Sequence, residues 1–409
     1  MGLGCGAMKR VYEELIHRDL EENRQMIFMA GPRQVGKTTC SLSAERYSSD
    51  FHYLNWDVPS HRQLIIAGPD AVAEKLGLLQ AKSNLPIVVF DEIHKYGKWK
   101  QFLKGFFDIY GSKVRIIVTG SAKLNIYKAG SDSLMGRYFL YRIHPFSVAE
   151  VISPKVIDKE IKAPHEIDSK QFNQLFEFGG FPEPFIKHSK SFATRWQRLK
   201  QQQLFKEDIR ELSQIQELAS LEMLAEILKS QAGQLVSYSN IANAVNVSIP
   251  TIQKWIKSLE AFYYCFTIKP WSKNVKRALR KEPKIYLWDW SVITDRGAKC
   301  ENFVAAHLLK AVHYWTDRGF GDYELYFIRD KEKREVDFLV TKDKKPWFLV
   351  EVKQSKNHSI SKALYQFQKI TGAAHAFQVV FDMDYVSKDC FDYTEPVIVP
   401  IQTLLSQLV

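Results

Sequence analysis

The chain has 409 residues and a mass of 47.4 kDa, too long for one ordinary hydrophobic core, and two to four domains are expected. Hydrophobic residues make up 45% and charged residues 25%, which excludes a disordered chain, and no apolar run reaches the ~18 residues of a membrane span. Lys and Arg number 57 against 46 Asp and Glu, and this net charge of +11 favours a polyanionic partner, most commonly nucleic acid.

The cysteines and the first residues predict a cytoplasmic protein. The five cysteines show no C-x-x-C spacing, so neither a disulfide framework nor a zinc site is indicated, and a reducing compartment is expected. The opening "MGLGCGAMKR" lacks the apolar core of a signal peptide, and Gly6 stands where a myristoylation motif requires Ser or Thr. Met8 is an alternative start. No membrane contact is predicted.

The first 150 residues predict an α/β domain. Short apolar runs at 26–30, 53–56, 87–90 and 114–119 alternate with amphipathic segments. Runs of this length bounded by turn residues are typical of buried parallel strands joined by helical crossovers.

A phosphate-binding loop follows the first of these strands. The segment "GPRQVGKT", residues 31–38, matches G-x-x-x-x-G-K-[ST] between a predicted strand and a predicted helix. Backbone N–H groups would surround the β-phosphate, Lys37 would contact the β- and γ-phosphates, and Thr38 would bind Mg²⁺. The residues predicted to bind the nucleotide are Gly31, Pro32, Arg33, Gln34, Val35, Gly36, Lys37, Thr38 and Thr39.

Two later strands carry the groups that ATP hydrolysis requires. "PIVVFDE" ends in Asp91, a predicted magnesium ligand, and Glu92, predicted to activate water. "VTGSA" follows, where Thr119 or Ser121 would sense the γ-phosphate, the alternative for this pair being ordinary strand-end capping.

Charge on the transferred phosphoryl group also requires an arginine, supplied by the same chain or by a neighbour. Arg137 is the candidate, with Arg33 and Arg142 as competitors. An arginine given to another copy would require a homo-oligomer, either a ring or a dimer.

A helical connector and a winged helix-turn-helix are predicted next. Leu218, Leu221, Leu224 and Leu228 recur at helical spacing. In a later helix Ile249, Ile252, Ile256 and Leu259 form one apolar stripe, Ser248 can cap the helix, and Pro250 suits its first turn.

The helix at 249–260 and the basic segment "SKNVKRALRKEPK" at 272–284 are predicted to contact DNA. The segment contains six basic residues. If all six contacted phosphates, log affinity would fall against log salt concentration with a slope of about −5. The alternative is a structural winged helix with a solvated basic loop. The residues predicted to contact DNA are Gln253, Lys254, Lys257, Lys276, Arg277 and Arg280.

The last 120 residues predict a second α/β unit with charged residues on a hairpin. In "EVDFLVTKDKKPWFLVEVK", residues 335–353, period-two alternation places Val336, Phe338 and Val340 on one face and Asp337 on the other. In the second strand Glu351 and Lys353 oppose the apolar face. Two carboxylates can hold a divalent cation and a lysine can orient water, whereas the alternative is a set of surface ion pairs.

The hairpin resembles the PD-(D/E)XK nuclease core through the pattern D-x13-E-x-K, although Val336 replaces the usual proline. This resemblance implies Mg²⁺ binding by Asp337 and Glu351, completed by Glu301 on the preceding helix. It implies that Lys353 assists phosphodiester hydrolysis.

The order of the phosphate loop, the "PIVVFDE" strand, "TGS", "LMGRYFLYRIHPFS" and "GGFPEP" resembles a bacterial and archaeal family of AAA+-like ATPases. Members carry a winged helix and a nuclease-like domain in the C-terminal half. The resemblance covers nearly the whole chain, including "YLNWD", "KEDIREL", "YLWD" and "ENFVAAHLL". It implies ATP binding by Gly36, Lys37 and Thr38, with Asp91 and Glu92 as the acidic pair.

The predicted fold is a parallel-sheet, AAA+-like P-loop ATPase domain (1–150), a helical connector (151–230), a winged helix (231–290) and an α/β restriction-endonuclease-like domain (291–409). The predicted function is Mg²⁺-dependent ATP binding and hydrolysis by a protein that acts on DNA. Three forms stay open: an enzyme that cuts DNA, an ATPase that only binds or remodels it, and a nucleotide-switched protein-interaction device. In the last two, a nucleotide-switched DNA- or protein-binding scaffold, the nuclease-like domain is catalytically inert.

Overall fold

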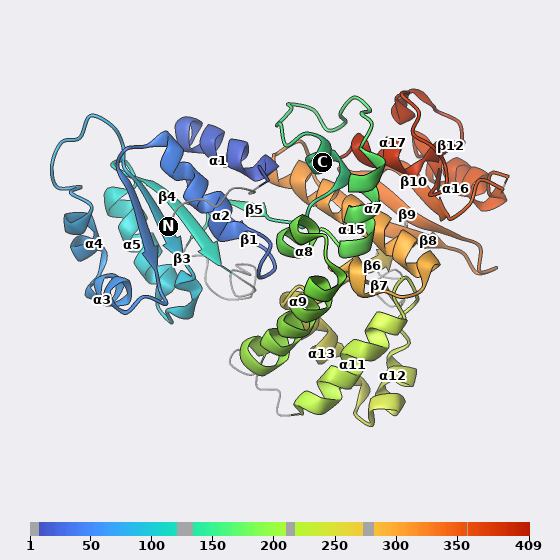
Figure 1. Cartoon of the computed structure of the whole chain (residues 1–409), viewed down its shortest axis with the longest axis horizontal. Helices are drawn as coiled ribbons and strands as arrows, with labels where there is room; N and C mark the ends of the chain where they lie inside the picture. The colour runs from blue at the N-terminus through green and yellow to red at the C-terminus, as the bar shows by residue number, and fades with distance from the viewer. Residues whose placement is uncertain (1–7, 121–133, 210–216, 273–281, 358) are drawn as a thin grey trace. The chain divides into compact units, whose positions relative to one another are not determined.

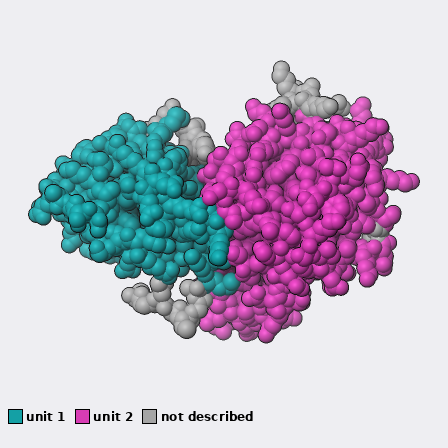
Figure 2. Space-filling view, turned by 90° about the horizontal axis from the view of Figure 1, so that it is seen from above, with its two compact units in different colours: residues 1–144, 154–156 teal, residues 145–153, 157–409 magenta. Residues whose placement is uncertain are grey.

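The chain folds as two compact units, coloured separately in Figure 2. Unit 1 comprises residues 1–144 and 154–156, and unit 2 comprises residues 145–153 and 157–409. The computed structural model describes residues 8–120, 134–209, 217–272, 282–357 and 359–409. In these ranges no helix is long and apolar enough to cross a membrane.

Unit 1 is built on a parallel sheet of five strands in the order β2-β3-β4-β1-β5 (Figure 1). The three central strands are almost wholly buried, because helices cover a parallel sheet on both faces. The four strands predicted from the apolar runs are confirmed to within about two residues at their ends. The strands are β1 (Met26–Ala30), β2 (Phe51–Asn55), β3 (Ile87–Asp91), β4 (Arg115–Gly120) and β5 (Tyr138–Arg142).

The core of unit 1 lies between the sheet and helices α3, α4 and α5. In α5 the apolar residues recur every three or four positions, and Phe102 and Phe106 meet the ring of Phe90 edge-on. Helices α1 and α2 pack against β1, β3 and β4. The helices are α1 (Val11–Glu22), α2 (Lys37–Leu42), α3 (Pro59–Ala67), α4 (Pro69–Lys75) and α5 (Trp99–Tyr110).

Unit 2 begins with helices. Leu221, Leu224 and Leu228 are buried on one side of α11, which confirms the predicted helix. A π-helical segment, Leu204–Ile209, follows α9. The helices of this part are α6 (Val148–Ile152), α7 (Ser169–Phe178), α8 (Pro182–Lys187), α9 (Lys190–Gln203), α11 (Leu218–Ser230), α12 (Tyr238–Val245) and α13 (Ile249–Ala261).

Helix α13 begins as predicted, since the Ser248 hydroxyl accepts a hydrogen bond from Thr251 N–H at 3.3 Å. Its buried stripe differs from the prediction at one end. Ile252, Ile256 and Leu259 are buried, but Ile249 in the first turn is 43% exposed, and Trp255 is buried instead. The stripe is covered only where neighbouring elements pack against the helix, and the first turn extends beyond them.

A mixed sheet of seven strands, in the order β12-β11-β10-β9-β8-β6-β7, forms the rest of unit 2 (Figure 1). Helix α15 packs on β7 to β10, and α16 packs on β9 to β11. The strands are β6 (Cys265–Pro270), β7 (Lys284–Leu287), β8 (Tyr323–Arg329), β9 (Glu335–Lys342), β10 (Lys345–Lys353), β11 (His375–Val380) and β12 (Val397–Pro400). The helices are α15 (Arg296–Asp317), α16 (Lys362–Thr371) and α17 (Ile401–Ser406).

The antiparallel pair β6–β7 follows α13, as the strands of a wing would, but it also belongs to this sheet. Lys269 of β6 pairs in parallel with Tyr326 of β8. The connector, the winged helix and the nuclease-like domain predicted as separate ranges are therefore parts of one compact unit.

Candidate nucleotide site and C-terminal carboxylate cluster

The predicted phosphate loop joins the carboxyl end of β1 to the start of α2. Gly36 has a φ of 96°, which glycine adopts without strain. A Cβ atom at Gly31 would lie 2.4 Å from the carbonyl oxygen of Ile143, so a larger residue does not fit there. The loop therefore requires both glycines. Gly36 provides the backbone conformation, and Gly31 allows the close approach to Ile143, which follows β5.

Lys37 is held inside this loop. Its ammonium group donates to the carbonyl oxygens of Gly31 at 2.9 Å and Pro32 at 2.6 Å, and the residue is only 7% exposed. A cation fixed within a loop of backbone amides is the arrangement that binds the terminal phosphates of a nucleotide.

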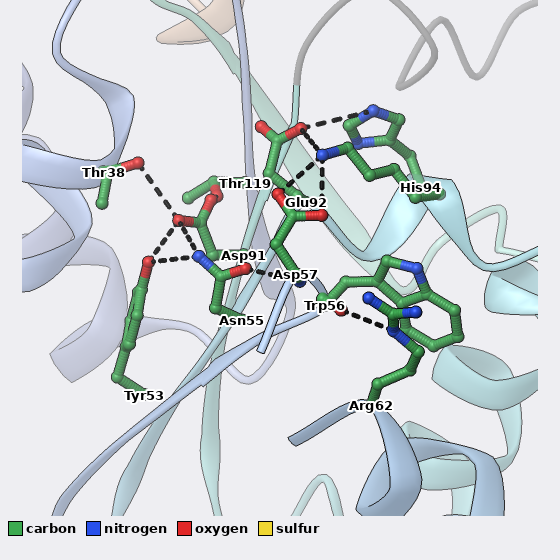
Figure 3. Close-up of polar contacts among 11 residues, drawn as sticks. Thr38, Tyr53, Asn55, Trp56, Asp57, Arg62, Asp91, Glu92, His94 and Thr119 are labelled. Atoms are coloured by element: carbon green, nitrogen blue, oxygen red, sulfur yellow. Dashed lines mark hydrogen bonds and ion pairs between the residues drawn. The ribbon is translucent and has the colours of Figure 1, made fainter. Parts of the chain in front are cut away.

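The carboxylate of Asp91 is the centre of a hydrogen-bond network at the ends of the strands (Figure 3). Asn55, Asp91 and Thr119 lie side by side on β2, β3 and β4. The hydroxyl of Thr38 donates to Asp91 at 3.2 Å, and the hydroxyls of Tyr53 and Thr119 also donate to it. Sheet order produces this geometry, because β4 lies between β1 and β3.

Thr38 and Asp91 fit a magnesium ion. Their hydroxyl and carboxylate oxygens converge beside the loop, and oxygen ligands of this kind are the ones that Mg²⁺ prefers. Burial, and then the hydrogen bond to Asp91, raise the pKa of Tyr53, so its phenol remains a donor at neutral pH.

Glu92 turns away from the strand at a φ of 56°. Its carboxylate lies 3.6 Å from Nε2 of His94 and 3.9 Å from Nζ of Lys95. Burial raises the pKa of Glu92 above its ordinary value, although Lys37 is close enough to lower it. A carboxylate with a raised pKa beside a phosphate site is suited to accept a proton from water.

The structure places the three arginine candidates at opposite edges of the sheet. Arg137 precedes β5, where its carbonyl accepts from Met26 N–H at 2.8 Å, and its guanidinium forms an ion pair with Asp108 at 2.7 Å. This is the amino edge, so Arg137 does not reach the phosphates of its own chain and remains a prediction only for a neighbouring copy. Arg33 in the loop and Arg142 at the carboxyl end of β5 are at the correct edge. Ser121 lies outside the described residues.

Charged side chains also gather in unit 2, at the place that the nuclease resemblance implies. We call this set the carboxylate cluster. It consists of Lys284 (β7), Glu301 (α15), Glu335 and Asp337 (β9), and Glu351 and Lys353 (β10).

Asp337 and Glu351 occupy the end of the β9–β10 pairing. Asp337 accepts a hydrogen bond from Val352 N–H at 2.8 Å, in place of a backbone partner. One oxygen of Glu351 accepts from Lys353 at 2.7 Å, and the other is buried with no hydrogen-bond partner among the described residues. Burial, and then the charge of Asp337, raise the pKa of both Glu301 and Glu351 to about 7.

The strict period-two alternation predicted for β9 is wrong at one point. Val336 packs with Leu339 in the core beneath α16, whereas the ring of Phe338 contacts Tyr286. The register between β8 and β9 shifts here, because Tyr326 pairs with Leu339 and Ile328 pairs with Val336. This β-bulge lets Leu339 share the core with Val336, while Phe338 lies against Tyr286.

Lys284 lies within the cluster, with its side chain 4% exposed. Its Nζ lies 2.6 Å from Glu335, 3.0 Å from Glu301 and 3.7 Å from Asp337. Burial alone would lower the pKa of Lys284, but Glu301 and its neighbours raise it above its ordinary value. Lys284 is the last of the six basic residues in the segment at 272–284, and the prediction that all six contact phosphates is wrong for it, because its charge is neutralised inside the protein.

The magnesium ion predicted at Glu301, Asp337 and Glu351 does not fit this arrangement. The ammonium group of Lys284 lies 3.0 Å from Glu301 and 3.7 Å from Asp337, two of the three carboxylates that would have to bind the ion. Within the ranges that the structure describes, no group of three or more His, Cys, Asp or Glu side chains is arranged to hold a metal.

The predicted DNA-contacting residues of α13 are exposed. Gln253, Lys254 and Lys257 face solvent on the side away from the buried stripe. The other three predicted contacts, Lys276, Arg277 and Arg280, lie outside the described residues.

Sequence reasoning missed the partners of the predicted site residues. Tyr53 and Asn55 belong to "YLNWD", and their spacing of two on a strand that ends beside Asp91 is the signal that identifies them. In unit 2, Tyr286 donates to Glu301 at 2.8 Å. "KIY" places Lys284 and Tyr286 on one strand face, but nothing in the sequence pairs that strand with the hairpin.

Known proteins resemble this chain along most of its length. Residues 23–152 match the family model described as "AAA domain". Residues 169–295 and 296–402 match two models described as domains of unknown function, DUF8612 and DUF4143.

Individual proteins resemble the chain at low identity. An uncharacterised protein of Methanocaldococcus jannaschii is 25% identical over 346 residues, covering 80% of this chain and 75% of that protein. An uncharacterised protein of Mycobacterium tuberculosis is 23% identical over 354 residues, covering 83% and 72%. A solved Walker-type ATPase of Pyrococcus abyssi has a TM-score of 0.41 and 16% identity, covering 70% of this chain and 95% of that one. Residues 23–152, which contain the phosphate loop and the Asp91 network, are therefore similar to an AAA domain.

Proposed function

We propose that unit 1 binds and hydrolyses ATP with Mg²⁺. The loop amides and Lys37 would hold the phosphates, Thr38 and Asp91 would hold the ion, and Glu92 would take a proton from the attacking water. The bound Mg²⁺ would neutralise the charge that develops on the phosphate oxygens. The observation that carries this proposal is the convergence of Thr38 and Asp91 beside the loop that encloses Lys37.

Two substitutions test the assignment. Lys37→Ala should abolish ATP binding, because it removes the cation inside the loop. Glu92→Gln should keep ATP binding but stop turnover, because an amide does not accept the proton. Binding is measured by calorimetry and turnover by phosphate release, with exposed Lys104→Ala and Glu45→Gln as matched controls. Ordinary hydrolysis by Glu92→Gln would refute the role of Glu92.

We also propose that unit 2 acts on DNA through α13. The exposed Gln253, Lys254 and Lys257, the following β6–β7 pair and the net charge of +11 support this role. A form of the protein that binds only other proteins would have no DNA affinity at physiological salt.

For the C-terminal domain, cutting DNA and merely holding it are the two candidate roles. The position of Lys284 among the carboxylates favours the second. Incubating the protein with ATP, Mg²⁺ or Mn²⁺ and single-stranded, duplex and forked DNA separates them. A protein that only holds DNA should leave every form intact, and Asp337→Ala should change nothing in that assay.

A further inference from the structure

We propose that the ammonium group of Lys284 is the resident cation of the carboxylate cluster and stands where a metallonuclease would hold a divalent metal. The cluster is then a metal-independent ion-pair network. This inference concerns unit 2 alone and does not depend on ATP hydrolysis.

The contacts of Lys284 define its role. Three carboxylates from two different elements, Glu301 on α15 and Glu335 and Asp337 on β9, surround one ammonium group at 2.6–3.7 Å. The side chain is 4% exposed, so it is not a mobile surface lysine that happens to lie near acids. The ring of Phe327 lies 5.8 Å from Nζ and closes a further side of the group.

The surrounding residues fix the same arrangement. Tyr286, two residues along β7, donates to the oxygen of Glu301 that Lys284 contacts. Gly233 has a φ of 81°, and a Cβ atom there would lie 3.3 Å from the carboxylate of Glu301. The carbonyl of Ile285, next to Lys284, accepts from Gly233 N–H at 2.8 Å. The backbone of β7 next to Lys284 is thus fixed by a hydrogen bond to Gly233. Its partner Glu301 lies between Tyr286 and Gly233.

Charge balance explains why the position takes a cation. Buried carboxylates that lie close together repel one another unless a positive charge lies between them. A divalent metal would supply that charge and also lower the pKa of a bound water, which is the step that phosphodiester hydrolysis needs. A lysine ammonium supplies the charge but has no open coordination position for water. With lysine as its cation, the cluster keeps its charge balance but cannot activate a water molecule for phosphodiester hydrolysis.

Glu351 has the feature that most favours a metal instead. One of its oxygens is buried without a hydrogen-bond partner among the described residues, while the other is bound by Lys353. A metal held there together with Asp337 is the arrangement that the experiment must exclude.

The test is titration with Mn²⁺ alone, without nucleotide, followed by electron paramagnetic resonance. The wild type should show no site that depends on the cluster. Lys284→Met keeps the length of the side chain and removes its charge, so it should gain about one Mn²⁺ per chain. Lys284→Met combined with Asp337→Asn should lose that ion, and Lys284→Arg should behave as the wild type.

A wild-type Mn²⁺ site that disappears in Asp337→Asn but persists in Asp91→Asn would overturn the proposal. A folded Lys284→Met protein that gains no ion would also overturn it, because Lys284 would then not stand in a cation site. Should Lys284→Met fail to fold, the wild-type and Asp337→Asn titrations decide the question without it.

Discussion

At the scale of single residues, Asp91 depends on hydroxyl groups from three different elements. Thr38, Tyr53 and Thr119 each donate to its carboxylate, which is 3% exposed. A buried charge is tolerated only when such donors replace its water. Thr119 is predicted to sense the γ-phosphate. Because its hydroxyl donates a hydrogen bond to Asp91, it also holds that carboxylate in place.

Thr119→Val separates these roles, because it keeps the shape of the side chain and removes its donor. Without nucleotide, we expect the variant to lower the free energy of unfolding of unit 1 by about 1.5–3 kcal/mol. Urea unfolding measures this change, and the exposed Thr194→Val is the matched control. A slower turnover with unchanged stability would instead indicate a sensor alone.

The carboxylate cluster predicts a pH dependence of stability. Glu301 and Glu351 have an ordinary pKa of 4.5, raised to about 7 in the folded protein. Between these values the folded state binds more protons than the unfolded chain, so unit 2 should lose stability as the pH rises through this range. Glu351→Gln removes one of the two titrating groups and should make the fall shallower.

The measurement is the urea midpoint of unit 2 across that pH range, for the wild type and for Glu351→Gln. Exposed Glu222→Gln serves as the control and should follow the wild type. Identical pH slopes for the wild type and Glu351→Gln would contradict the raised pKa of Glu351.

At the scale of elements, α13 presents one buried and one exposed side. If the exposed side contacts phosphates, Lys254→Ala and Lys257→Ala together should weaken binding to all DNA sequences and reduce the slope of log affinity against log salt by about 2. Fluorescence anisotropy over a salt series measures both. Lys369→Ala on α16 removes an equal exposed charge and should leave the slope unchanged. An unaltered slope in the double variant would remove α13 from the DNA contact.

Local pattern predicted the elements well and their pairing poorly. The strands of unit 1, the phosphate loop and the cap of α13 follow from apolar runs, glycine spacing and a serine, all of which act within a few residues. The role of Lys284 does not, because two of its partners, Glu335 and Asp337, lie on β9, which begins about 50 residues later in the chain. The β-bulge between Val336 and Leu339 does not follow from local pattern either, since a register shift belongs to two strands and not to one.

At the scale of the whole molecule, the two sites are each complete within one unit. Every residue of the Asp91 network belongs to unit 1 and every residue of the carboxylate cluster belongs to unit 2. A defect at one site therefore does not remove a side chain from the other. Lys37→Ala, which we expect to abolish ATP binding, should for this reason leave every side chain of the carboxylate cluster in place.

The β6–β7 pair has one more consequence. Strand β6 leaves the end of α13 almost directly and is stitched into the seven-stranded sheet, while β7 carries Lys284. Helix α13 is therefore joined to the sheet by a short connection and not by a long linker. We therefore expect that a displacement of α13 would also move β6 and, through its pairing with β6, the strand that carries Lys284.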